Sequence, residues 1–462
     1  MNAARDDRGV AVRLGGAVAL FLLLVGQAQV TVLDGSSMLA VAQSLVHHGS
    51  LAVPPELGVA GHDGVTYYSK YGILLPLLSV VPVALAQPIG AVTGRVDLVE
   101  AAAAASLMPL VAGALAGALH LLGRRLGAPR AAAGLVAAGT VLGTYLLPYG
   151  RDFFTEPLVA LGVVVMVERA LARRELQAGA ALAVAILARP QSAAFAPLLF
   201  GFLALRGGGV AAIVRTLPPL AIAGLATVAY NLYRFHNALE FGYRPPADPG
   251  FTTPLLDGAG GLLFSPEKSV VLFAPAIVLV PLALAALWRR DRATASLLLA
   301  HFSATFVLAA TWWSWMGGWS WGPRLLIPGV AVVLVAVGPW IGADATRWKL
   351  AAMLFALGFV LSFSAVLAPA GTQLLDRRPG TDGPQIVRQY RELPGLAEHS
   401  IDAAGDRSAR GGDYRRYLAP WQANAVREFG SAGIVPALLG TLALLAALLW
   451  LARPLRRSLR PA

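Results

Sequence analysis

Apolar runs of about 20 residues recur along the whole chain, and each is long enough for one helix to cross the hydrocarbon core of a bilayer. Hydrophobic residues make up 57% of the 462 residues, and only 13% are charged. A soluble domain carries about 25% charged residues. Because the Leu, Ala and Val runs do not alternate with polar residues, they indicate helices and not barrel strands. We therefore predict an all-α polytopic membrane protein.

The apolar runs define about twelve predicted transmembrane helices. Their ranges are 12–33, 98–122, 131–148, 153–171, 177–190, 191–205, 216–233, 269–288, 294–311, 323–341, 350–370 and 431–452. Residues 1–370 form the predicted transmembrane module. The stretch 371–430 is expected to be a small extracytoplasmic segment, and 431–462 to be a last transmembrane helix with a basic cytoplasmic tail.

Arginine and lysine are concentrated in every second loop between the predicted transmembrane helices. Cytoplasmic loops of membrane proteins carry an excess of these residues. With the N-terminus in the cytoplasm, the cytoplasmic clusters are Arg124/Arg125/Arg130, Arg169/Arg173/Arg174, Arg206/Arg215, Arg289/Arg290/Arg292, Arg347/Lys349 and Arg453/Arg456/Arg457/Arg460. We expect a multi-pass protein of the bacterial plasma membrane with both termini cytoplasmic. These loops also account for the net charge of +12, so nucleic acid is not an expected partner.

One apolar segment, 72–93, does not fit this alternation. If it crossed the membrane, Arg124 and every later basic cluster would change side. The segment also contains Pro76, Pro82 and Pro88. Irregular backbone at membrane depth is tolerated only where protein or a wet cavity shields it. We therefore predict a re-entrant or peripheral element in a first outer loop that spans 34–97.

Asp34 directly follows the first predicted span and precedes a predicted helix over 36–48. Met38, Leu39, Ala42 and Leu45 recur there at helical spacing. The spacing predicts an amphipathic helix on the membrane surface. Asp34 is a suitable N-cap for this helix, and a carboxylate at a helix start can also act as a base.

Several cations fall on the predicted outer side, where the orientation rule expects few. They are Lys70, Arg151, Arg189, Arg234, Arg244, Lys268 and Arg324. Cations at membrane ends need anionic partners, and the planar guanidinium group of arginine fits a phosphate. This departure from the rule indicates a phosphate-binding site on the outer face.

Five tryptophans lie between Trp312 and Trp321, interrupted by glycines and followed by Gly322-Pro323-Arg324. Tryptophan prefers the membrane interface, so an interfacial belt is one explanation. Stacking of a sugar or lipid on exposed indole faces is the other. The expected platform residues are Tyr68, Lys70, Trp315, Trp319 and Trp321.

Metal chemistry has few candidate ligands in this chain. There is no cysteine, and the histidines of the first outer loop do not have zinc spacing. Asp152 and Glu156 lie in a second acidic outer loop, and a divalent cation such as Mg or Mn held by these carboxylates stays open.

Five motifs in this order resemble the glycosyltransferase C superfamily of membrane enzymes, which use polyprenyl-phosphate sugars. They are VTVLDGSSMLAVAQSLVHHGSLAV at 30–53, YYSKYGILLPLLSV at 67–80, LLGRRLGAPR at 121–130, YGRDFFTEPL at 149–158 and LARPQS at 187–192. The resemblance covers most of residues 10–345. It implies the fold of that superfamily and a hexosyl- or pentosyltransferase, of the protein mannosyltransferase or arabinosyltransferase kind.

The resemblance also implies roles for particular residues. Asp34 matches the catalytic carboxylate and would deprotonate the acceptor hydroxyl. Asp152 and Glu156 match the second acidic motif, which binds metal or acceptor in some members. The candidates for binding the donor phosphate are Arg151, Arg189, Lys268 and Arg324. Gly35 stands where several members carry a second acidic residue, which argues against a metal at that position.

The implied reaction is inverting transfer of a sugar from a polyprenyl-phosphate donor to a cell-envelope glycan or glycolipid, on the outer face of the bilayer. Two alternatives remain open from sequence. One is a transporter or flippase for a lipid-linked saccharide, although the predicted spans are nearly free of charge. The other is a ligase that joins a preassembled glycan to an acceptor.

Overall fold

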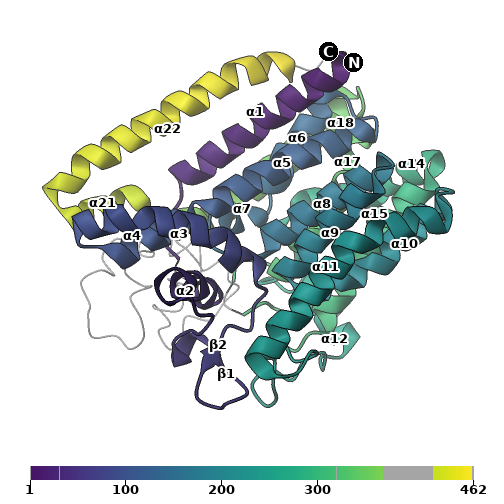
Figure 1. Cartoon of the computed structure of the whole chain (residues 1–462). Coiled ribbons are helices and arrows are strands. Elements are labelled where there is room, and N and C mark those ends of the chain that lie inside the picture. Colours follow the sequence, from purple (N-terminus) through teal and green to yellow (C-terminus); the bar gives the residue numbers. More distant parts are fainter. Residues whose placement is uncertain (1, 31, 319, 368–419, 460–462) are drawn as a thin grey trace.

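The computed structural model describes residues 2–30, 32–318, 320–367 and 420–459. These residues form a bundle of helices with one short two-stranded hairpin (Figure 1). The helices are α1 Asn2–Leu24, α2 Leu33–His48, α3 Leu74–Thr93, α4 Val96–Ala105, α5 Leu107–Arg125, α6 Arg130–Leu142, α7 Leu146–Tyr149, α8 Glu156–Leu171, α9 Glu175–Ala188, α10 Ala196–Leu205, α11 Gly209–Phe235, α12 Leu255–Phe264, α13 Val270–Phe273, α14 Val280–Arg290, α15 Arg292–Thr311, α16 Ile327–Leu334, α17 Val337–Ile341, α18 Ala345–Leu367, α21 Trp421–Phe429 and α22 Ser431–Ser458.

Shorter elements connect these helices. The 3-10 turns are η1 Pro55–Leu57, η2 Pro190–Phe195, η3 Pro275–Leu279 and η4 Arg324–Leu326. Strands β1 Val59–Ala60 and β2 Tyr67–Tyr68 pair antiparallel, with Val59 opposite Tyr68. Within the described residues, each of the twelve predicted spans overlaps a helical segment, and the all-α membrane fold is confirmed.

The number of membrane crossings stays a prediction. Within the described residues, six helical segments are long and apolar enough to cross a bilayer: Leu74–Thr93, Val96–Arg125, Gly209–Phe235, Arg292–Thr311, Ala345–Leu367 and Ser431–Arg456. The other apolar helices are shorter. The expected segment 371–430 lies almost entirely outside the described residues.

One end of the bundle, here called the basic end, gathers the N-terminus and several basic loops. Asp7 of α1 pairs with Arg124 (3.1 Å) and Arg130 (2.6 Å). Further contacts continue the network from loop to loop: Arg125 to Glu168, Arg173 to the Arg206 carbonyl, and Arg206 to Asp291. Clusters that were predicted to share one side of the membrane therefore lie together.

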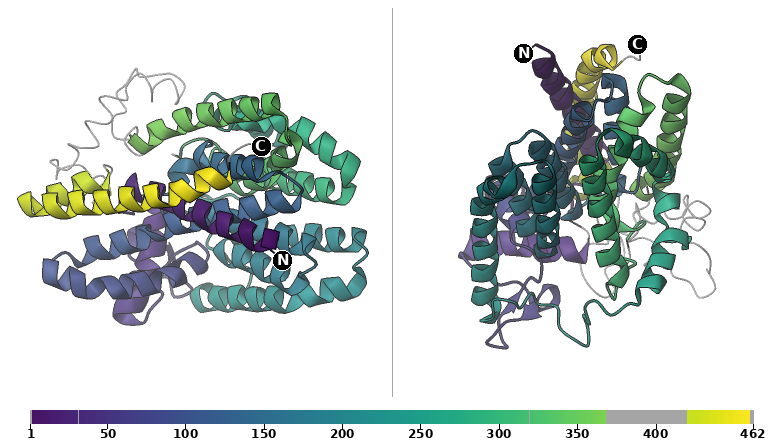
Figure 2. Two further views of the ribbon diagram at one scale, coloured as in Figure 1. Left: turned by 90° about the horizontal axis from the view of Figure 1, so that it is seen from above. Right: turned by 90° about the vertical axis from the view of Figure 1, so that its right-hand side faces the viewer.

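Helices α1 and α5 run close together because small residues face each other. A Cβ on Gly113 would collide with the carbonyl oxygen of Gly15, and one on Gly117 would come within 3.0 Å of the Ala11 carbonyl oxygen. Such small-residue contacts drive helix packing in membranes. Helix α22 lies along the other side of α1 (Figures 1 and 2), where a Cβ on Gly16 would be 3.0 Å from Leu451.

The opposite end, here called the cavity end, carries α2, α3 and the hairpin. Most of the segment 72–93 is one continuous helix, α3, which begins at Leu74 and contains Pro82 and Pro88. Its start follows Tyr71, which contacts Asp34. Its other end leads to Leu98, whose carbonyl accepts a hydrogen bond from Gln29 just after α1. Both ends of α3 therefore lie at the cavity end.

The first predicted span ends earlier than the sequence indicated. Helix α1 stops at Leu24, and the chain leaves helical geometry through Gly26 and Ala28, whose φ is +51°. The amides of Gln27 and Gln29 are buried in this stretch. The helix predicted over 36–48 is present as α2, and its residues Met38, Leu39 and Ala42 pack against α3, α4 and Phe153.

Candidate active site

A cavity of about 680 Å³ opens at the cavity end between α8, α9, α11, α15 and the loops that follow α11 and α15. Both polar and apolar side chains line the cavity. The polar side chains include Asp34, Lys70, Tyr71, Arg189, Asn231, Arg234, Glu240, Tyr243, Asp248 and Arg324. The apolar ones include Val159, Leu187, Phe195, Phe241, Phe251, Leu308, Trp312, Trp313 and Leu325. A ligand with both a charged and a long apolar part fits such a cavity.

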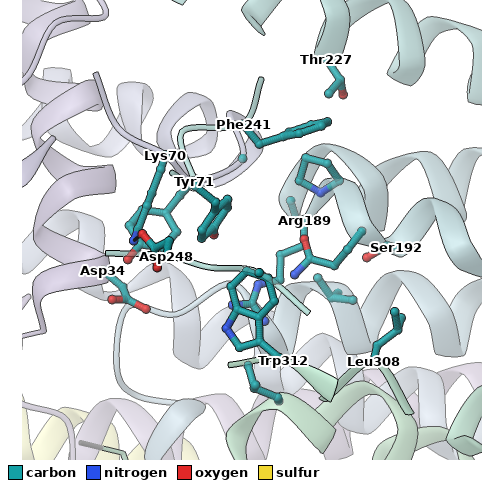
Figure 3. A pocket seen from close by; sticks show the side chains of 18 of the residues that line it. Asp34, Lys70, Tyr71, Arg189, Ser192, Thr227, Phe241, Asp248, Leu308 and Trp312 are labelled. Carbon is teal, nitrogen blue, oxygen red and sulfur yellow. Dashed lines mark hydrogen bonds and ion pairs between the residues drawn. The ribbon is translucent and has the colours of Figure 1, made fainter. Parts of the chain in front are cut away.

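Asp34 reaches the cavity from the first turn of α2 (Figure 3). It is not the N-cap, because Val32 occupies that position without a side-chain hydrogen bond. Gly35 is required beside it, since a Cβ there would come within 2.8 Å of the Phe153 carbonyl oxygen. A second acidic residue at position 35 would not fit.

Two arginines and two carboxylates from four chain segments form a charge cluster at the cavity wall. Arg324 donates from Nη1 to Oδ2 of Asp34 at 2.8 Å. The same Nη1 lies 3.8 Å from Oε1 of Glu156, and Nη1 of Arg189 lies 3.2 Å from that oxygen. We call Asp34, Glu156, Arg189 and Arg324 the charge quartet. Its formal net charge is zero.

The Asp34 carboxylate is ionised in this setting. Burial opposes its ionisation, but the charge of Arg324, a hydrogen bond from Tyr71 and the charge of Arg189 hold the pKa of Asp34 below its ordinary value of 3.8. Burial, reinforced by the Asp34 charge, raises the pKa of Tyr71, which therefore stays a hydrogen-bond donor. An ionised carboxylate at a cavity wall can accept a proton from a bound hydroxyl.

A second ion pair crosses the cavity mouth. Nζ of Lys70 lies 2.7 Å from Oδ2 of Asp248 and 5.0 Å from the centre of the Tyr243 ring. Figure 3 shows Lys70, Tyr71 and Asp248 close to Asp34, with Arg189 across the cavity. The pair joins the segment before α3 to the loop after α11, so the loop closes one side of the cavity.

Arg234, at the end of α11, contacts the segment that precedes α3. Its guanidinium stacks on Tyr230 at 3.6 Å and donates to Asn231 Oδ1 at 2.6 Å. It also donates to the Ser69 carbonyl, next to Lys70. Arg234 lines the cavity, but most of its donors are already used.

Arg151 and Asp152 lie away from the cavity. The buried Arg151 guanidinium donates to the carbonyls of Val25 at 2.9 Å and Ala365 at 3.4 Å, so it joins α1 to α18. Burial raises the pKa of Asp152, although the Arg151 charge opposes that shift. Neither residue lines the cavity, where the predicted phosphate and acceptor roles would place them.

Lys268 is also directed away from the cavity. Its ammonium group contacts the carbonyls of Gly318 (3.3 Å), Ser320 and Gly322 (3.4 Å). Burial and the neighbouring charge of Arg324 lower the pKa of Lys268 to about 7. Lys268 therefore fastens the loop that leads to Arg324 and is not placed to contact a phosphate.

The aromatic platform differs from the expected one. Trp315 packs on Gly261 of α12, and Trp321 is buried edge-on to Phe273 at 5.0 Å. Tyr68 is buried against Tyr233 and Phe235. Trp319 lies outside the described residues. The aromatic rings that line the cavity at this end are instead Phe241, Tyr243, Phe251, Trp312 and Trp313.

Trp312 was overlooked because the tryptophan run gave no rule for choosing among its members. The end of α15 at Thr311 decides the matter, since Trp312 is the first residue after it. Trp312 then meets Tyr243 and Phe251 edge-on, at 5.4 and 5.1 Å. Asp248 and Tyr243 had no local signal in the sequence, because only the fold brings their loop over the cavity.

The carboxylates do not converge on a metal position. Among the described residues, no three His, Cys, Asp or Glu side chains are close enough to share an ion. Glu156 faces two guanidinium groups, and Asp152 faces Arg151. Among the described residues, Asp152 and Glu156 therefore do not form a donor set that fits Mg or Mn, the cations left open from the sequence.

Neither a protein-family model nor a curated protein matches this sequence. Solved structures do match. ArnT from Cupriavidus metallidurans bound to undecaprenyl phosphate has a TM-score of 0.50 and 15% identity, covering 94% of this chain and 76% of ArnT. This chain has the fold of the glycosyltransferase C superfamily.

Two further solved structures are similar to this chain. Apo ArnT from the same organism has a TM-score of 0.49 and 15% identity, covering 94% of this chain and 76% of that one. The oligosaccharyltransferase of Archaeoglobus fulgidus in the apo form has a TM-score of 0.47 and 13% identity, covering 84% of this chain and 59% of that one. The fold expected from the five motifs is confirmed by the bound ArnT structure.

Proposed function

We propose that this protein is an inverting glycosyltransferase that moves a sugar from a polyprenyl-phosphate donor to a cell-envelope glycan or glycolipid on the outer face of the membrane. The observation that carries the proposal is an ionised carboxylate, Asp34, paired with Arg324 in the wall of a cavity that is lined by both charged and apolar side chains. ArnT, whose fold this chain shares, is described bound to undecaprenyl phosphate.

The proposed reaction is a single displacement at the anomeric carbon. The acceptor oxygen forms the new bond to that carbon while Asp34 takes the hydroxyl proton. The bond between the anomeric carbon and the phosphate oxygen breaks, and its electron pair leaves with the lipid phosphate. Configuration inverts because the acceptor attacks opposite the leaving group.

The arginines of the charge quartet supply the electrostatic part of catalysis. The leaving lipid phosphate gains negative charge as the glycosidic bond breaks, and Arg324 and Arg189 line the cavity where this charge would develop. Guanidinium groups pair with phosphate oxygens in a planar, two-point geometry. Lys70 and the rings of Tyr243 and Trp312 would border the sugar.

Asp34→Asn tests this proposal. The amide has the same shape but cannot take the proton, and loss of a positioned base lowers a rate by about 100- to 10,000-fold. The measurement is sugar transfer by the purified protein in lipid nanodiscs, with the donor identified by mass spectrometry of co-purified lipids. Retained transfer in Asp34→Asn would contradict the assignment.

Asp97→Asn is the matched control. Asp97 also lies in the first turn of a helix at the cavity end, but it is exposed and outside the cavity. We expect normal transfer from this variant.

The alternatives give different results in the same system. A transporter or flippase would move labelled lipid-linked saccharide across vesicles without consuming it. A ligase would require a preassembled glycan on the donor and would reject a single sugar.

A further inference from the structure

Glu156 occupies an unusual place in the charge quartet. It is 1% exposed and is not among the residues that line the cavity, whereas Arg189 and Arg324 both are. Its Oε1 contacts Nη1 of both arginines, at 3.2 and 3.8 Å. Because both Nη1 atoms contact the same oxygen, they lie close to each other. The carboxylate is on the side of the two arginines that does not line the cavity.

A local helix-capping role does not account for this placement. Glu156 is the first residue of α8, where a negative charge is favourable. However, α8 has no side-chain cap, and within the described residues neither Glu156 oxygen makes a hydrogen bond. The carboxylate faces the end of α9 and the start of η4, which carry Arg189 and Arg324.

We propose that Glu156 is a positioning residue that holds Arg189 and Arg324 side by side as one phosphate-binding pair. The inference rests on the proposed function and concerns the same site. Two guanidinium groups this close repel each other in a poorly solvated wall, and an anion between them offsets that repulsion. The oxygens of one phosphate group could then accept hydrogen bonds from both arginines on the cavity side.

Asp34 and Glu156 are therefore expected to act on phosphate in opposite directions. Asp34 lines the cavity and occupies Arg324 at 2.8 Å, so it competes with a phosphate for that guanidinium. Glu156 does not line the cavity, so it does not compete with a phosphate for the cavity-facing side of either guanidinium group. If both carboxylates acted only through their negative charge, neutralising either one would strengthen phosphate binding.

The test compares the two acid-to-amide variants by binding of undecaprenyl phosphate, without sugar, to protein in nanodiscs. We expect Glu156→Gln to weaken binding about tenfold, since one charge-assisted hydrogen bond is lost when an arginine moves away. We expect Asp34→Asn to bind as tightly as wild type or more tightly. Glu156→Asp keeps the charge and should retain most of the affinity.

Glu168→Gln provides the matched control. Glu168 is on the same helix, is also buried, and also pairs with two arginines, Arg125 at 2.6 Å and Arg169 at 3.0 Å. It lies at the basic end, so Glu168→Gln should bind the lipid like wild type. A general loss from neutralising a buried carboxylate of α8 would appear in both variants.

A cycle with Arg189→Lys completes the experiment and does not depend on one variant folding well. If Glu156 acts through the arginine pair, Glu156→Gln costs far less affinity in the Arg189→Lys background. Additive effects, or tighter binding by Glu156→Gln, would overturn the inference while leaving the proposed function intact. Absence of lipid binding to wild type would overturn both.

Discussion

At the scale of single residues, Arg324 connects most of the features of the site. It pairs with Asp34, approaches Glu156, and stacks over Phe154 at 5.0 Å. Gly317 leaves room for its side chain, since a Cβ there would be 2.9 Å from Arg324 Cγ. The guanidinium also has an Nε with no hydrogen-bond acceptor in the described part of the chain.

Arg324→Gln should move the acid limb of the pH profile of kcat/KM. Asp34 keeps a pKa below 3.8 because of Arg324, although burial acts in the opposite direction. In wild type, activity is lost only as pH falls through that low pKa. Without the arginine, burial dominates and the limb moves to higher pH. An unchanged limb in a variant that retains measurable transfer would contradict Asp34 as the base.

The same shift has a consequence for stability. Because the folded pKa of Asp34 lies below its unfolded value, the ion pair contributes stability above about pH 4. That contribution is lost as pH falls through the folded pKa.

Lys268→Met should destabilise the protein by about 2 kcal/mol, since the carbonyls of Gly318, Ser320 and Gly322 lose the hydrogen bonds that the buried ammonium group donates. With its pKa lowered from 10.5 to about 7, Lys268 holds its proton more tightly in the unfolded chain. Wild type should therefore gain stability relative to the variant as pH rises between these two values. Thermal unfolding in detergent measures both effects.

Lys349→Met is the control for that experiment. Lys349 is exposed near the start of α18, and its replacement should change stability by less than about 0.5 kcal/mol. Equal losses in the two variants would contradict the anchoring role of Lys268.

Sequence reasoning reached Asp34, Arg189 and Arg324, because each is a charge that breaks the pattern of its surroundings. It could not separate these from Lys268 and Arg151. All five are cations or carboxylates near span ends, and only the fold decides whether backbone carbonyls or a cavity lies opposite. The prediction of which tryptophans line the cavity was wrong for a related reason, since the direction of each side chain depends on where α15 ends.

At the scale of elements, the site depends on how closely α1 and α5 pack, because α1 leads into the segment that carries Asp34. Helical spacing predicted α2 well, but its apolar face turned out to meet α3 and α4. Sequence periodicity shows that a helix has an apolar face. It does not show whether lipid or another helix covers that face.

Gly113→Leu should separate α1 from α5 and destabilise the protein by about 1–3 kcal/mol or more, because the new side chain meets the backbone of Gly15. Gly224→Leu on α11 is the control, since no heavy atom lies within 4 Å of a Cβ there. Thermal unfolding of both variants provides the comparison. Equal stability would contradict the close packing of the two helices.

At the scale of the whole molecule, the alternation of basic loops was the most informative signal in the sequence. The basic clusters around Arg124, Arg169, Arg206 and Arg290 lie together at one end of the bundle, and the cytoplasmic position of this end stays a prediction. Helix 72–93 has hydropathy enough to cross a bilayer, and composition alone could not show that both of its ends lie at the cavity end.

Single introduced cysteines test the orientation directly, because the chain has none of its own. Val65, 79% exposed in the hairpin, lies at the cavity end, and Leu176, 57% exposed at the start of α9, lies at the basic end. A membrane-impermeant maleimide should label Val65→Cys in intact cells and Leu176→Cys only after permeabilisation. The reverse pattern would place the cavity on the cytoplasmic side.

The pairing of Asp34 with Arg324 also has a consequence for how the protein is made. The two residues are 290 positions apart, so the ribosome delivers Asp34 to the membrane long before its partner exists. Glu156 and Arg189 can meet as soon as the α8–α9 hairpin is inserted. Arg324 is synthesised only after α15, and a chain interrupted before that point would hold an unbalanced carboxylate at the cavity end.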